Sequence, residues 1–146
     1  MINKSTTSRL NILKGTKIND IDDYLSDNGH LIKASDYFSD YLYKKNIKAS
    51  DIVKKCQGYI SKSYIYDLLN GKKVNPSRDN VILICLASNM NLKETRRTLE
   101  LFGHRNLYPK DNRDALIAIF INNNIFDIPI INDSLFEHQL PALTED

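Results

Sequence analysis

The sequence predicts an all-α fold, and two kinds of pattern support that prediction. Apolar residues recur at helical spacing in successive stretches, and residues typical of helix caps stand at the borders of these stretches. The composition of the 146 residues is that of an ordinary globular chain, with 42% hydrophobic residues, 26% charged residues, and only 5 Gly and 4 Pro. This length allows one domain, or one domain with an appendage.

Several patterns of other protein classes are missing from the sequence. The longest apolar run, residues 81–87, is too short to span a bilayer, and residues 1–17 lack the layout of a signal peptide. Cys56 and Cys85 lie in apolar helical patterns and have no metal-ligand spacing. We therefore expect a cytoplasmic protein with reduced thiols that binds no metal, no cofactor and no membrane.

Basic residues are concentrated in the middle of the chain. Residues 44–78 contain nine Lys or Arg and two Asp, a formal charge of +7, whereas the rest of the chain carries −5. A basic segment in a mildly acidic chain is a footprint for polyanion binding. It is equally compatible with a solvated, lysine-rich surface, so charge alone leaves both interpretations open.

The first half of the chain predicts a tail and three short helices before its central stretch. Residues 1–17 have no sustained period and are expected to form an extended or poorly ordered tail, and a short helix follows from Ile18 to about residue 28. The tetrapeptide K-A-S-D then occurs at residues 33–36 and at residues 48–51. In each copy the serine, Ser35 or Ser50, is predicted to be the N-cap of a helix.

The central stretch, residues 61–73, predicts a short amphipathic helix. Ser61 is expected to be its N-cap, and Asn70-Gly71 its end. Ile65, Leu68 and Leu69 fall on one side of the helix. The other side is polar and carries Lys62, Ser63, Tyr66, Asp67 and Asn70. A shorter helix before it, joined through the Gly-bearing turn at residues 57–60, completes the pattern of a helix-turn-helix.

The second half predicts two helical pairs. After the break at Asn75-Pro76, Ser77 is expected to cap a helix whose residues 81–87 are apolar on nearly all sides, so that it forms the buried spine. A capping box at residues 91–94 opens the next helix. The S-R-D of residues 77–79 is then followed 35 residues later by N-R-D and another apolar helix. This recurrence indicates either an internal duplication or two helical hairpins that merely look alike.

These motifs resemble a known family. The run from residue 47 to residue 77, with I-K-A-S-D-I-V-K-K-C, S-K-S-Y-I-Y-D-L-L-N-G-K and N-P-S, resembles the lambda repressor/Cro-like (XRE-type) helix-turn-helix regulators. The later P-S-R-D, N-L-K-E-T, L-Y-P, N-R-D-A-L-I and L-P-A-L resemble a subgroup of small regulators from Gram-positive bacteria. One departure is the turn at residues 57–60, which is longer than the family's usual turn.

The resemblance implies an architecture and a function. We expect a flexible tail at residues 1–17, a lambda repressor-like DNA-binding domain at residues 18–107, and a C-terminal helical hairpin at residues 108–146 packed on that domain. The implied function is sequence-specific binding of double-stranded DNA by a homodimeric transcriptional regulator, a repressor rather than an activator. The residues expected at the DNA are Ser50, Ser61, Lys62, Ser63, Tyr66, Asn70, Lys72, Lys73, Asn75 and Arg78.

An alternative function stays open. The chain would then be a protein-interaction module, or an antitoxin-like partner that inhibits a neighbouring enzyme through its C-terminal helices. No sequence motif of a metalloprotease, a Cys-His pair or a phosphate loop occurs, so we expect no enzymatic activity.

Overall fold

The computed structural model describes residues 14–15, 17–21, 33–72 and 75–144. Within these ranges the secondary structure is helical and contains no strand, which confirms the all-α prediction for this part of the chain. None of the helices described is both long enough and apolar enough to cross a membrane. The chain divides into two compact units, residues 1–33 and residues 34–146.

The first unit is described only in part. Its one helical element with described bounds is the 3-10 helix η1 (Ile18–Asp20), and Ile18 is exposed there. Most of the helix predicted to begin at Ile18, and most of the predicted tail, lie outside the described residues. The second unit begins at Ala34, whereas the predicted DNA-binding domain begins at residue 18.

Three short helices open the second unit. They are α3 (Ala34–Lys44), α4 (Ala49–Lys55) and α5 (Lys62–Leu69), and both α3 and α4 pack against α5. The apolar residues Phe38, Leu42 and Ile52 are at most 5% exposed, so the inner faces of these helices belong to the core. Burial of such faces is the main source of stability for helices of this length.

The predicted caps of α3 and α4 are wrong. Both helices begin one residue before the serine, so that Ser35 and Ser50 lie inside the first turn. At α4 the N-cap position is taken by Lys48, whose backbone is extended. The Asp51 carboxylate accepts a hydrogen bond from the Lys48 backbone N–H at 3.0 Å. A side chain three residues into the helix therefore reaches back to satisfy the cap, which leaves the Ser50 hydroxyl exposed.

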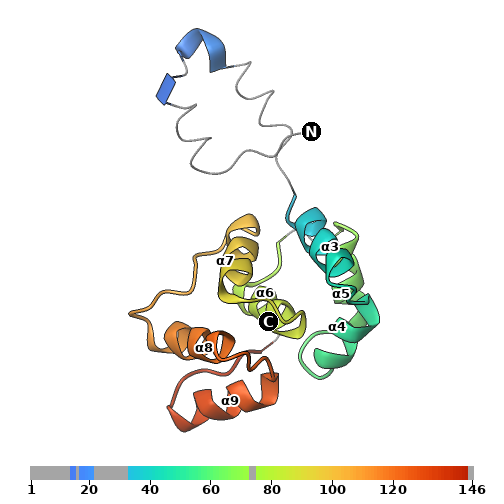
Figure 1. Cartoon of the computed structure of the whole chain (residues 1–146), viewed down its shortest axis with the longest axis vertical. Coiled ribbons are helices and arrows are strands. Elements are labelled where there is room, and N and C mark those ends of the chain that lie inside the picture. Colours follow the sequence, from blue (N-terminus) through green and yellow to red (C-terminus); the bar gives the residue numbers. More distant parts are fainter. Residues whose placement is uncertain (1–13, 16, 22–32, 73–74, 145–146) are drawn as a thin grey trace. The chain divides into compact units, whose positions relative to one another are not determined.

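Helix α6 (Arg78–Ala87) is the spine of the unit, as predicted. All residues from Asn80 to Ala87 are at most 2% exposed. The Ser77 hydroxyl caps it by accepting from the Asn80 backbone N–H at 3.1 Å. Figure 1 shows α6 between the α3–α5 group and the later helices, and α6 packs against α4, α7 and α9. A helix that is apolar on every side needs such neighbours all round.

The other helices are α7 (Leu92–Leu101), α8 (Asn112–Asn122) and α9 (Ile128–Glu137). The predicted capping box of α7 is present, since Asn91 and Glu94 each accept a hydrogen bond from the other's backbone N–H. Helix α9 is capped by Asp127, whose carboxylate accepts a hydrogen bond from the Ile130 backbone N–H at 3.0 Å. Pro129 sits in the first turn of α9, where its missing N–H is not needed.

Helices α6–α7 form a first hairpin and α8–α9 form a second, and the two hairpins are related by a local repeat. Each first helix ends at an asparagine with positive φ, Asn89 at 55° and Asn124 at 58°. The tail that follows each hairpin buries one leucine, Leu107 or Leu143. Helix α7 packs on α8, and α9 packs on α6, which is the arrangement expected of two hairpins related by a two-fold rotation.

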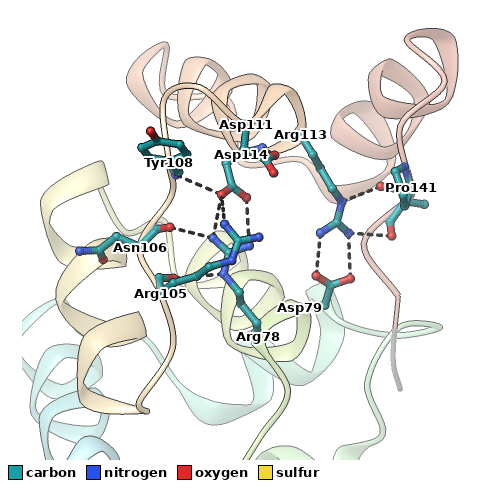
Figure 2. A network of polar contacts seen from close by, with 10 residues as sticks. Arg78, Asp79, Arg105, Asn106, Tyr108, Asp111, Arg113, Asp114 and Pro141 are labelled. Carbon is teal, nitrogen blue, oxygen red and sulfur yellow. Dashed lines mark hydrogen bonds and ion pairs between the residues drawn. The ribbon is translucent and has the colours of Figure 1, made fainter.

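Reciprocal ion pairs join the hairpins (Figure 2). Arg78 of the first hairpin pairs with Asp114 of the second through two hydrogen bonds of 2.9 and 3.0 Å. Arg113 of the second hairpin pairs with Asp79 of the first through bonds of 2.9 and 2.8 Å. The recurrence at an offset of 35 residues is therefore a structural repeat. The arginine of each Arg-Asp dipeptide pairs with the aspartate of the dipeptide in the other hairpin.

Candidate nucleic-acid interface

Helix α5 is fixed at both ends and along one face. The Ser61 hydroxyl accepts a hydrogen bond from the Tyr64 backbone N–H at 3.2 Å, as predicted for an N-cap. Asn70 is the C-cap, and Gly71 follows with a φ of 77°, a conformation that favours glycine. On the inner face Ile65 is 0% exposed and Leu68 is 1% exposed. The position and rotation of the helix are therefore set by its caps and its buried side chains.

The outer face of α5 is polar and open to solvent. Lys62, Ser63 and Asn70 are exposed, and Tyr66 keeps 36% of its surface exposed. The Lys62 Nζ lies 6.0 Å from the centroid of the Tyr66 ring, which is at the outer limit of a cation–π contact. These residues place an ammonium, a hydroxyl, a phenol and an amide along one helix face. Such a face can both donate and accept hydrogen bonds.

The turn between α4 and α5 is ordered by backbone hydrogen bonds and by buried side chains. It runs from Cys56 to Ser61, longer than the three or four residues common in this motif. The backbone N–H groups of Tyr59 and Ile60 both donate to the Cys56 carbonyl, at 2.8 and 2.9 Å. Gly58 has a φ of 88°, and Ile60 is only 3% exposed. The additional residues are thus folded back on the end of α4.

Exposed lysines lie on α4 and α5 and in the neighbouring stretches of the chain. Within the described part of residues 44–78, every lysine is exposed, and none forms an ion pair with another described residue. These residues are Lys44, Lys45, Lys48, Lys54, Lys55, Lys62 and Lys72. Their charge is therefore available to an external anion. The Lys55 Nζ makes one long contact, 3.5 Å from the Asn89 side-chain oxygen.

Of the other residues expected at the DNA, some are exposed and one lies outside the described residues. Ser50 is exposed in the first turn of α4, and Lys72 and Asn75 are exposed on either side of a short gap after α5. Lys73 lies in that gap, outside the described residues.

Arg78 has an internal role in the structure. Besides Asp114, its guanidinium contacts the carbonyl oxygens of Arg105 and Asn106 at 3.1 and 2.9 Å (Figure 2). Four of the five N–H donors of an arginine are thereby used within the fold. The side chain is only 16% exposed. A phosphate contact by Arg78 stays a prediction, and it would have to use the remaining donor.

Asp114 is the centre of this internal network, and its burial could not be predicted from the sequence around it. Its side chain is 1% exposed and accepts hydrogen bonds from Arg78, from Arg105 at 2.9 Å, and from the Tyr108 backbone N–H at 3.0 Å. Burial acts to raise the pKa of Asp114, but these hydrogen bonds and the two arginine charges outweigh it and lower the pKa. The one available signal was the repeated R-D dipeptide.

Two other kinds of site, a metal centre and a reactive thiol, depend on the His, Cys, Asp and Glu side chains of the described residues. No cluster of three or more His, Cys, Asp or Glu that could hold a metal ion occurs within them. Burial raises the pKa of both Cys56 and Cys85 to about 12, so each thiol stays protonated at neutral pH. Their predicted place in the core is confirmed, since both are 0% exposed.

Comparison with protein-family models, with curated proteins and with solved structures gives no match for this chain. What it binds therefore has to be inferred from its own residues. Among the described surfaces, the α4–α5 pair combines a fixed helix, a polar outer face and unpaired lysines.

Proposed function

We propose that this chain is a sequence-specific, double-stranded DNA-binding regulator of the lambda repressor-like helix-turn-helix type. The observation that carries the proposal is the division of α5 into two faces. Ile65 and Leu68 are fully buried, while Lys62, Ser63 and Tyr66 face solvent on a helix capped at both ends. The width of the major groove admits one α-helix, and its base edges are read by side chains of these types.

In the proposed complex α5 enters the major groove with its N-terminus first. Lys62 donates to the O6 and N7 atoms of a guanine, and Ser63 and Tyr66 contact base edges or the adjacent phosphates. The lysines of α3 and α4, together with Lys72, bind phosphates, which set the register and the affinity. Arg78 is left out of this contact set because its guanidinium is bonded to Asp114.

The proposed mechanism is repression by occupation of a promoter. A single helix as short as α5 contacts too few base pairs to select one site in a genome, so two copies of the chain are expected to bind paired half-sites. Bound in this way, the dimer excludes polymerase from the same stretch of DNA. No catalytic step is required.

A DNA titration tests the proposal, and its expected result is binding that weakens steeply with salt. Selection from a random duplex pool would first supply the preferred sequence, and the affinity would then be measured between about 50 and 200 mM salt. Lys62→Ala is expected to cost about 1–3 kcal/mol on the preferred sequence and less on unrelated DNA. Lys93→Ala, at an exposed lysine of α7 outside the proposed interface, is the matched control and should bind as the wild type does.

Two results would contradict the proposal. Undetectable or salt-independent binding would exclude a phosphate-contacting interface. Equal losses for Lys62→Ala and Lys93→Ala would mean that α5 has no special place in the complex. A loss for Lys62→Ala of the same size on every sequence would keep DNA binding but make Lys62 a phosphate contact.

A further inference from the structure

The two hairpins of the repeat differ in how their outer sides are covered by other described elements. In the first hairpin the outer residues of α6 are buried, since Val81, Ile84 and Cys85 are at most 2% exposed. Helix α4 packs on α6 and α3 packs on α7, and the Tyr41 hydroxyl donates to the Ser88 carbonyl at 2.8 Å. An aromatic-bearing helical group therefore seals the outer side of this hairpin.

Within the part of the chain that the structure describes, the corresponding side of the second hairpin is not covered. At an offset of 35 residues, the equivalents of those three buried residues are Leu116, Ile119 and Phe120. Ile119 is 60% exposed, and the other two are half-buried. They line a groove of about 560 Å³ between α8 and α9, together with Asn112, Ala115, Ser134, His138 and Leu140.

The sequence of α8 is that of a helix buried on all sides. Its residues from Ala115 to Ile121 are all apolar, as in the corresponding part of α6. Such a helix is expected in the interior of a fold. An apolar face left in water beside a groove of this size is typical of a surface that receives another helix.

The charges of the second hairpin indicate what kind of helix could bind there. Between residues 111 and 144 the only Lys or Arg is Arg113, and it is paired with Asp79. The acids Asp127, Asp133 and Glu137 are exposed, and Asp111 is half-exposed. None of these acids lines the groove, whose polar wall residues are Asn112, Ser134 and His138, but they make the hairpin that carries it acidic, which disfavours nucleic acid and favours a basic partner.

We propose that the α8–α9 groove is the docking site for an amphipathic helix of a partner protein. That helix carries large aromatic or aliphatic side chains at helical spacing on one face, and Lys or Arg beside them. Ile119 and Leu116 contact its apolar face, and the acids of the second hairpin contact its basic edges. This role is separate from DNA binding, because the groove lies on α8 and α9 and the proposed DNA contacts lie on α5 and its surroundings.

A peptide of residues 33–48 of this chain is a suitable probe, because α3 packs on the corresponding hairpin and has the required chemistry. Its sequence, K-A-S-D-Y-F-S-D-Y-L-Y-K-K-N-I-K, contains four Lys and two Asp. Labelled peptide titrated with the full chain is expected to bind saturably and more weakly at high salt. Ile119→Glu should weaken this binding about tenfold or more, the loss typical of a central interface residue.

Phe136→Glu is the matched control, since Phe136 is 82% exposed on α9 and does not line the groove. It should bind the peptide as the wild type does. Both variants are expected to unfold at the wild-type urea concentration, and Ile119→Glu should bind DNA normally. Absence of saturable peptide binding to the wild type would overturn the proposal, and so would equal losses in both variants. A wild-type dimer that Ile119→Glu converts to a monomer would also overturn it, because the groove would then belong to a second copy of the chain.

Discussion

Asp114→Asn is expected to lower the free energy of unfolding by about 3–5 kcal/mol, the range for breaking a buried ion pair by removing one partner. The substitution keeps the volume but removes the charge that Arg78 and Arg105 both contact. The new amide group would also point N–H donors at arginine donors. The loss should therefore appear as a large shift of the urea unfolding midpoint at neutral pH.

The repeat supplies a control for this substitution. Asp79 forms the reciprocal pair with Arg113, but its side chain is 21% exposed, whereas that of Asp114 is 1% exposed. Water screens the more exposed pair better, so Asp79→Asn is expected to cost clearly less than Asp114→Asn. Equal costs would show that burial does not set the strength of these two pairs.

The Asp114 carboxylate is also expected to make the folded chain less stable in acid. The folded-state pKa of Asp114 is lowered from its ordinary value of 3.8, so the unfolded chain binds the proton at a higher pH than the folded chain. Its contribution is present above pH 3.8 and is lost as the pH falls through the lowered value. Urea unfolding at pH 7 and below pH 4 should show a smaller pH dependence for Asp114→Asn than for the wild type. An unchanged dependence would assign the acid sensitivity to other carboxylates.

Ile65→Ala is the second substitution with a large expected effect. Ile65 is 0% exposed and holds α5 to the core, so its truncation is expected to cost about 2–5 kcal/mol through lost burial and a residual cavity. The measurement is again urea unfolding, followed by circular dichroism. DNA affinity should also fall, because a less firmly held helix presents its polar face in more than one orientation.

Tyr66→Ala, one residue further along α5, separates the two roles of the helix. Tyr66 is 36% exposed on the outer face, and its removal should change stability by no more than about 0.5 kcal/mol. In the proposed complex it contacts DNA, so affinity should fall while stability does not. A large loss of stability for Tyr66→Ala, or none for Ile65→Ala, would mean that the two faces of α5 are assigned wrongly.

Local patterns explain why much of the fold was predictable. Ser61, Ser77 and Asn91 are caps in the structure, as predicted from the sequence, because a cap depends on side chains within three residues of the helix start. The burial of residues 81–87 followed from their unbroken apolar character. Ser35 and Ser50 failed as caps because the helices begin one residue earlier, a boundary that composition does not define.

The exposed and buried faces of the candidate interface were likewise predictable from local sequence. The two faces of α5 follow from helical periodicity, so Lys62, Ser63 and Tyr66 are found outside and Ile65 inside. Arg78 shows the limit of such a prediction. An arginine at a helix start beside a basic segment suits a phosphate, and nothing local reveals that Asp114, 36 residues away, already takes two of its N–H donors.

The sequence by itself thus determined the helices, most of their caps and their buried faces, because each depends on residues that are neighbours along the chain. Only the tertiary structure decided which partners those faces and charges meet. It paired the arginine of each Arg-Asp dipeptide with the aspartate of the other. Among the described residues, it also buried the outer face of α6 and left Ile119 of α8 exposed. These outcomes depend on residues far apart in sequence, whose approach is set by the packing of whole helices.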